Sequence, residues 1–244
     1  MTNLQAHIRG RGLIGSGLSL LVLLLCAACQ TITPTGKQPA VPALAPAPPL
    51  PVEGSTHFRI DPGKSVLRIL VYRGGPLAEF GHNHVIEAGG LEGDVYLMPD
   101  LRASGFRFRI PVAGLVVDPD AARQEEGKDF ATQPSPQAIA GTRENMLGAK
   151  VLDAANYPEI VVRSLGMTGP AWAPDMTVRI TLHGVSRDMT VPVAMNRDGN
   201  SLVVTGTADL LQTDFGMTPF SVMGGGLRVE DKVRVRFHIV AAKD

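Results

Sequence analysis

Four consecutive residues, Gly81-His82-Asn83-His84, carry the side chains best suited to chemistry. In an extended segment, residues two apart project from the same face, so His82 and His84 would point the same way. Imidazole is a common ligand of zinc and copper, and one hypothesis is therefore a metal-binding or redox site at this pair. Further ligands are available at His57, His183, Asp94 and Glu87. The competing interpretation is a polar turn, because these residue types suit loops and no third ligand is placed by spacing.

Signatures of catalysis are weak in the rest of the chain. The three glycines at residues 224–226 are followed by neither a Lys-Ser/Thr pair nor a helix pattern, so they do not form a phosphate-binding loop. Ser164, Ser186 and Ser221 have no evident histidine and aspartate partners. We therefore expect a binding protein and not an enzyme.

The composition excludes one class of partner. The chain has 244 residues, of which 44% are hydrophobic and 19% charged, as expected of one globular domain. The 23 basic and 23 acidic side chains give a net charge of +0, and no basic cluster is interleaved with aromatic residues. A nucleic-acid partner is therefore not expected.

The N-terminus has the pattern of a bacterial secretion signal. Arg9 and Arg11 precede an apolar run, residues 18–25, which is too short for a comfortable membrane span. The run ends in Leu25-Cys26-Ala27-Ala28-Cys29, which looks like a lipobox. Residues 1–28 are therefore predicted to be a signal peptide and Cys29 the lipid-modified residue. Gln30 after it favours a lipid anchor on the periplasmic side of the outer membrane.

Residues 29–55 form a predicted linker, rich in proline and alanine and almost uncharged. Such a tract favours an extended polyproline-like conformation and acts as a semi-rigid spacer. Neither of the two cysteines lies beyond residue 29, so the domain at residues 56–244 has no disulfide and no thiolate ligand.

Alternation of apolar and polar residues predicts that this domain is mainly β. In residues 105–112 the side chains of Phe106, Phe108 and Ile110 share one face. The same pattern places Ile180 with Leu182, and Val235 with Phe237. Further strands are expected at residues 65–72, 85–98, 160–162, 189–194 and 201–211, with a turn at Asp198-Gly199-Asn200 and bends at Gly89-Gly90 and Gly93.

One stretch departs from the strand pattern. Residues 119–126 and 136–149 carry helix formers, and Thr132-Gln133-Pro134-Ser135-Pro136 separates them with capping residues. Many strands with tight turns and a single helical excursion predict an antiparallel barrel or sandwich with a short helical insertion, and the family resemblance described below implies the up-and-down β-barrel. About eight strands enclose room for one ligand or are filled by their own side chains, and the sequence leaves these alternatives open.

Several short motifs occur in the order typical of one family. They are Ile60-Asp61-Pro62 with Ser65-Val66, Asn145-Met146-Leu147, Asn156-Tyr157-Pro158-Glu159-Ile160, His183-Gly184-Val185-Ser186 and Asp214-Phe215-Gly216-Met217. From about Phe58 to about Val240 the chain resembles the YceI-like family, the polyisoprenoid-binding, lipocalin-like β-barrels of bacterial envelopes. Lys64 stands where many members have a histidine, so a role for that histidine does not carry over.

The resemblance implies a barrel whose apolar tunnel holds a polyisoprenoid or a quinone-like lipid, for storage, transport or sensing at the cell envelope. We expect the ligand to contact Phe106, Phe108, Ile110, Ile180, Leu182, Phe215, Val235 and Phe237. The metal hypothesis at His82 and His84 remains the alternative function. Pairing of two copies into a homodimer is left open by the sequence.

Overall fold

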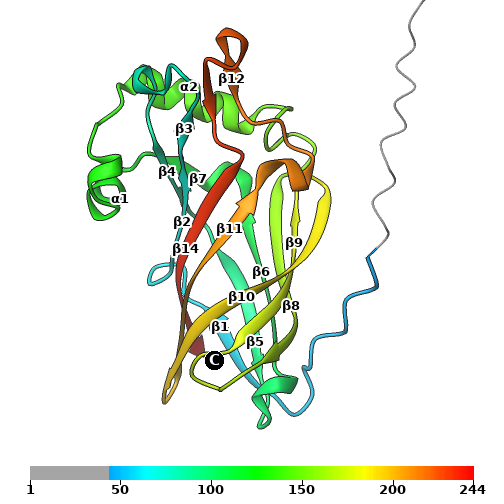
Figure 1. The fold of residues 1–244 in the computed structure, drawn as a ribbon. Helices are drawn as coiled ribbons and strands as arrows, with labels where there is room; N and C mark the ends of the chain where they lie inside the picture. The colour runs from blue at the N-terminus through cyan, green and yellow to red at the C-terminus, as the bar shows by residue number, and fades with distance from the viewer. Residues whose placement is uncertain (1–43) are drawn as a thin grey trace, which may run out of the picture. The chain divides into compact units, whose positions relative to one another are not determined.

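Eight antiparallel strands close into a barrel in the computed structural model, which describes residues 44–244 (Figure 1). The predicted signal peptide, Cys29 and the first part of the linker lie outside the described residues. Each strand of the ring pairs with the ring strand that follows it in the sequence, and the last ring strand pairs with the first. This confirms the up-and-down barrel. In order, the strands are β1 (Thr56–Ile60), β5 (Glu92–Leu97), β6 (Gly105–Pro111), β8 (Glu159–Thr168), β9 (Asp175–Leu182), β10 (Val185–Asp198), β11 (Ser201–Leu211) and β14 (Lys232–Lys243).

Three of these strands continue beyond a bend at one end of the barrel. There β2 (Val66–Val71) follows β1, β4 (His84–Ala88) precedes β5, and β7 (Leu115–Val117) follows β6. At the bend the Gly89 amide donates to the Gly114 carbonyl at 2.9 Å. A Cβ atom on Gly114 would lie 2.4 Å from the Gly89 oxygen, so this close approach requires glycine. The bend predicted at residues 89 and 90 is present.

The chain between β7 and β8 leaves the sheet, as predicted. It forms α1 (Asp120–Glu125), the 3-10 turn η4 (Lys128–Phe130) and α2 (Pro136–Leu147). The Ser135 hydroxyl caps α2 by accepting from the Ala138 amide at 3.2 Å. In Figure 1, α2 lies across the upper end of the barrel and α1 lies beside β2 and β4. Phe130 and Ala122 pack there on Leu70 and Val85, forming a small second core outside the barrel wall.

The remaining elements are short. A separate three-stranded sheet at the upper end consists of β12 (Ser221–Val222), β13 (Leu227–Val229) and β3 (Arg73–Gly74) (Figure 1). The other 3-10 turns are η1 (Ala78–Phe80), η2 (Leu101–Ala103), η3 (Val112–Gly114), η5 (Gln212–Phe215) and η6 (Met223–Gly225). The turn predicted at residues 198–200 joins β10 to β11. Within residues 44–244, no helix has the length and apolar character needed to cross a membrane.

Candidate functional site

The barrel encloses an apolar cavity of about 270 Å³. Because side chains alternate between the two faces of a strand, every second residue of the ring points into this space. Among residues 44–244, all of those that line the cavity are apolar except Ser104 and Gln212. Seven of the eight residues predicted to contact a ligand lie in this wall: Phe106, Phe108, Ile110, Ile180, Leu182, Val235 and Phe237. Ligand contact by these side chains stays a prediction.

The burial of the inward side chains shows that the barrel is hollow. Ile110 and Ile180 are buried, whereas Phe106, Phe108 and Phe237 are only half-buried on the same inner face. The exposed part of these rings faces the cavity that they line. In a filled barrel, packing against the opposite wall would bury them completely. The alternative of a closely packed interior is therefore wrong for this chain.

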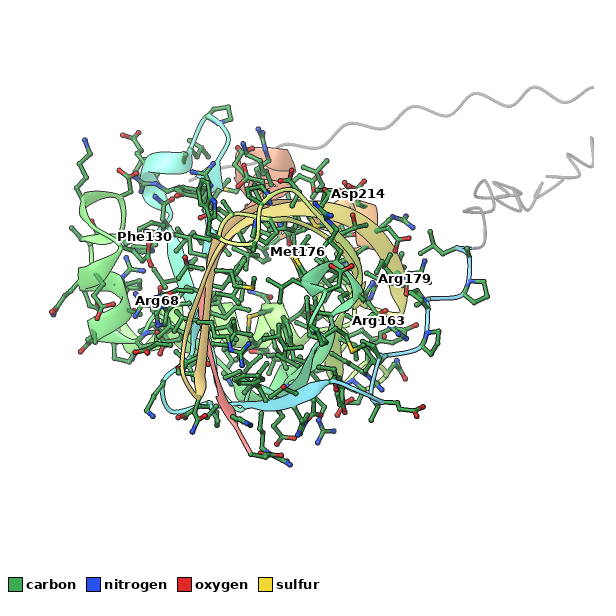
Figure 2. The ribbon with its side chains drawn as sticks, turned by 90° about the horizontal axis from the view of Figure 1, so that it is seen from below. Arg68, Phe130, Arg163, Met176, Arg179 and Asp214 are labelled. Carbon is green, nitrogen blue, oxygen red and sulfur yellow. The ribbon has the colours of Figure 1, made fainter. Side chains whose placement is uncertain are left out.

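The cavity is elongated along the barrel. On β11 its lining residues run from Leu202 to Leu210, which is roughly 26 Å of strand at about 3.3 Å per residue. Methionines line it near one end, and Met176 is seen there when the barrel is viewed from below (Figure 2). At the other end Met146 of α2 and Leu152 after it contribute to the wall. The helical insertion therefore supplies part of the lining of the cavity at the upper end.

Phe215 is the one predicted lining residue that does not reach the cavity. The alternation of β11 ends at Leu211, and η5 then turns the chain, with Gly216 at a φ of 75°. Phe215 is buried in the surrounding core, and its carbonyl lies 3.1 Å from Nδ1 of His183. Gln212 takes the inward position in its place. The alternate spacing of Ala208, Leu210 and Gln212 indicates that all three face inward. Gln212 was not predicted because only apolar side chains were expected to line the cavity.

The Gly81–His84 motif fastens the helical insertion to the sheet. His84 Nδ1 lies 2.6 Å from Oδ2 of Asp118, and the Arg123 guanidinium donates to the other oxygen of that carboxylate. The Asn83 amide donates to the Asp129 carbonyl at 2.9 Å, and its oxygen accepts from the Arg73 amide at 3.0 Å. Two side chains of the motif are thus committed to contacts within the protein.

Burial and neighbouring groups shift the pKa values of Asp118 and His82. Burial by itself raises the pKa of the Asp118 carboxyl, but hydrogen bonds from His84, the Val85 amide and Arg123 outweigh it and hold the pKa below its ordinary value. Burial lowers the pKa of His82, and the neighbouring His84 and Arg123 lower it further. Asp118 is therefore an anion, and the Arg123 cation stands beside it.

The structure does not assemble the proposed metal site. The rings of His82 and His84 have centroids 6.3 Å apart, and within residues 44–244 no three histidine, cysteine or acidic side chains gather as metal ligands do. The further ligands suggested by the sequence lie elsewhere. His57 contacts Asp94 at 2.9 Å, Glu87 contacts Arg68 at 2.8 Å, and His183 contacts the Phe215 carbonyl. His84 already has a partner, Asp118, 34 residues away. Metal binding at His82 and His84 stays a hypothesis.

Comparison with known proteins identifies the family. A YceI-like domain model matches residues 58–241. The chain belongs to the YceI-like family. The crystal structure of Burkholderia cenocepacia BcnA superposes with a TM-score of 0.57 at 17% identity, covering 75% of this chain and 99% of that one. A polyisoprenoid binding domain from Saccharophagus degradans, implicated in plant cell wall breakdown, gives 0.52 at 12% identity, covering 78% and 99%. No curated protein matches the chain.

The YceI-like barrel also holds the end of its proline-rich tract. The guanidinium of Arg179 donates to the Ala45 carbonyl at 2.7 Å, and that of Arg163 donates to the Pro48 carbonyl. Arg163 and Arg179 are direct partners across β8 and β9. Carbonyls three residues apart point the same way in a polyproline helix, which has three residues per turn. The last part of the predicted linker therefore lies on the outer wall, on the side of Arg163 and Arg179 (Figure 2).

Proposed function

We propose that this YceI-like barrel binds one apolar chain, a polyisoprenoid or a quinone-like lipid, along the axis of its cavity. The observation that supports the proposal most strongly is the elongated apolar wall, in which Ser104 and Gln212 are the only polar side chains from the described part of the chain. Hydrocarbon needs no polar partner, because burial contributes roughly 25 cal/mol per Å² of apolar surface removed from water. A long prenyl tail therefore binds such a wall through its area alone.

The family supports this assignment. The solved domain from Saccharophagus degradans, which shares the fold, is described as polyisoprenoid binding. The wall also favours binding over catalysis, because no acidic, basic or thiol side chain of residues 44–244 lines the cavity. The protein would store, carry or sense the lipid and would not transform it.

The cellular setting of the proposal comes from the N-terminal sequence. Secretion across the inner membrane and acylation of Cys29 would anchor the protein on the periplasmic side, at the outer membrane. The proline-rich tract would then connect the anchor to the barrel. A carrier in this position would have access to membrane lipids without spanning the bilayer.

A pair of variants on β11 tests the proposal. Ala208→Phe places a ring in the cavity, because Ala208 lines it, whereas Thr207→Phe places the same ring on the exposed outer face. We expect mass spectrometry of organic extracts to find about one prenyl lipid per wild-type or Thr207→Phe chain, and much less with Ala208→Phe. Equal lipid content in folded Ala208→Phe and Thr207→Phe proteins would contradict binding inside the barrel.

A further inference from the structure

Gln212 is an unusual member of the cavity wall. It lies in η5, drawn in orange at the upper end of β11 in Figure 1, and the residue is 7% exposed. The wall around it is apolar, with Leu210, Met217 and Val233 among the lining residues. A buried amide in such surroundings needs hydrogen-bond partners for both its nitrogen and its oxygen.

Within residues 44–244, only the nitrogen of this amide has hydrogen-bond partners. Nε2 donates to the Glu230 carbonyl at 2.9 Å and reaches the Asp231 carbonyl at 3.4 Å. Carbonyl oxygens only accept hydrogen bonds, so the nitrogen must face them, and the orientation of the amide is fixed. The opposite atom, Oε1, accepts no hydrogen bond from residues 44–244.

An unsatisfied acceptor at this place is a recognition feature. The apolar residues around it offer this oxygen no donor, whereas a ligand in the cavity is able to bring one to it. Ser104, the other polar residue of the wall, differs in this respect. Its hydroxyl already accepts from the Met98 amide at 2.9 Å, and its side chain is half-exposed at the far end of the barrel.

The surroundings of Gln212 also define the charge of the ligand. No lysine, arginine or histidine of the described chain lines the cavity, so an anionic head group would have no counter-charge there. Desolvating an unpaired charge is far more costly than desolvating a hydroxyl. The wall therefore favours a neutral polar end.

We infer that Oε1 of Gln212 accepts a hydrogen bond from a hydroxyl or N–H group at the polar end of the apolar ligand, and so selects neutral lipids that carry a donor. Prenyl alcohols and hydroquinones have such a group, whereas prenyl ethers, hydrocarbons and oxidised quinones do not. The inference rests on the proposed function and adds a preferred direction: the head lies at the η5 end and the tail runs toward Met176.

The test compares farnesol with farnesyl methyl ether, in which a methyl group replaces the hydroxyl hydrogen, so that the donor is lost and the prenyl tail is the same. We expect the delipidated full-length chain to bind farnesol roughly fivefold more tightly than the ether, as one hydrogen bond gives. Gln212→Met, which keeps the side-chain length, is expected to bind both probes alike. Ser104→Ala is the matched control at the other end, and it is expected to keep the wild-type preference. Farnesyl diphosphate is expected to bind more weakly than farnesol.

The outcomes separate the inference from the proposed function. If neither probe binds the wild type, the proposed function fails. If both bind but the ether equals farnesol, or Gln212→Met keeps the preference, only the role of Gln212 is overturned. Tighter binding of the diphosphate overturns the neutral head group. Since the Nε2 contacts also hold the chain near β14, a second measurement uses the wild type alone. A photoreactive farnesol analogue, labelled at its hydroxyl end, should crosslink near η5, and crosslinks confined to the neighbourhood of Ser104 would overturn the direction.

Discussion

The imidazole of His84 lies 2.6 Å from the carboxylate of Asp118, whose side chain is completely enclosed. Asp118 directly follows β7, at a φ of 53°, and the Arg123 guanidinium binds its other oxygen. One carboxylate thus joins β4, the end of β7 and α1. This junction fixes the start of the helical insertion, which later contributes Met146 to the cavity wall.

Removing the charge of Asp118 should therefore destabilise the fold. In Asp118→Asn the buried Arg123 cation loses its counter-ion, which costs about 3–5 kcal/mol for buried pairs. Asparagine tolerates the left-handed backbone, so the loss reports on charge and not on strain. Asp209→Asn, which breaks an exposed pair with Arg234, is the control and should cost less than about 1 kcal/mol. Urea unfolding measures both, and equal losses would show that the junction is not stabilising.

The pH dependence of stability should have two components. The pKa of Asp118 is lower in the folded protein than its ordinary value of 3.8, so its contribution is present at neutral pH and is lost as the pH falls below that value. The pKa of His82 is below its ordinary value of 6.5, so the unfolded chain binds the proton more readily and stability also declines as the pH falls below 6.5. We expect His82→Asn to remove the decline at the higher pH only. Unfolding curves at a series of pH values test this, and an unchanged profile in His82→Asn would contradict the second component.

Polarity of the cavity wall should control lipid retention. Phe108 lines the cavity and stacks with Phe106, with ring centroids 5.9 Å apart. Phe108→Asp places a carboxylate against the tail and should lower retained lipid at least about tenfold. Arg107→Asp puts the same charge one residue away on the exposed face and should leave the lipid content unchanged. The measurement is the amount of lipid per mole of folded protein. A folded Phe108→Asp protein with the wild-type lipid content would show that Phe108 does not contact the lipid.

The turn between β9 and β10 offers a test of packing against backbone strain. His183 and Gly184 have φ values of 52° and 72°, and a Cβ on Gly184 would lie 2.4 Å from Cε1 of Tyr157. Gly199 has a φ of 54° with no atom within 4 Å of the position of a Cβ. Gly199→Ala should therefore cost about 1 kcal/mol from conformation alone. Gly184→Ala should cost at least about 1 kcal/mol more, because the Tyr157 ring must move. Thermal melts compare the two variants, and equal costs would mean that the ring adjusts freely.

Local sequence patterns were sufficient to predict the strands, and the resemblance to the YceI-like family indicated a barrel rather than a sandwich. Alternation in residues such as Phe106, Phe108 and Ile110 fixes which face of a strand is apolar, and the glycine turns fix where strands end. Both the alternation and the turns depend on residues close together in the sequence, so the sequence alone is enough to predict them. The helical insertion was predictable for the same reason, since Ser135 and Pro136 mark the start of α2.

Only the tertiary structure decided the cavity and the roles of His84 and Gln212, because these features depend on residues far apart in the chain. Whether Phe108 and Phe237 meet across the barrel or leave a cavity depends on the summed volume of eight strands, which alternation does not encode. The role of His84 depends on Asp118, and that of Gln212 on the carbonyls of Glu230 and Asp231. The type of a side chain determines which hydrogen bonds it is able to form. The folded chain determines which partners stand within reach, and therefore which group is left free for a ligand.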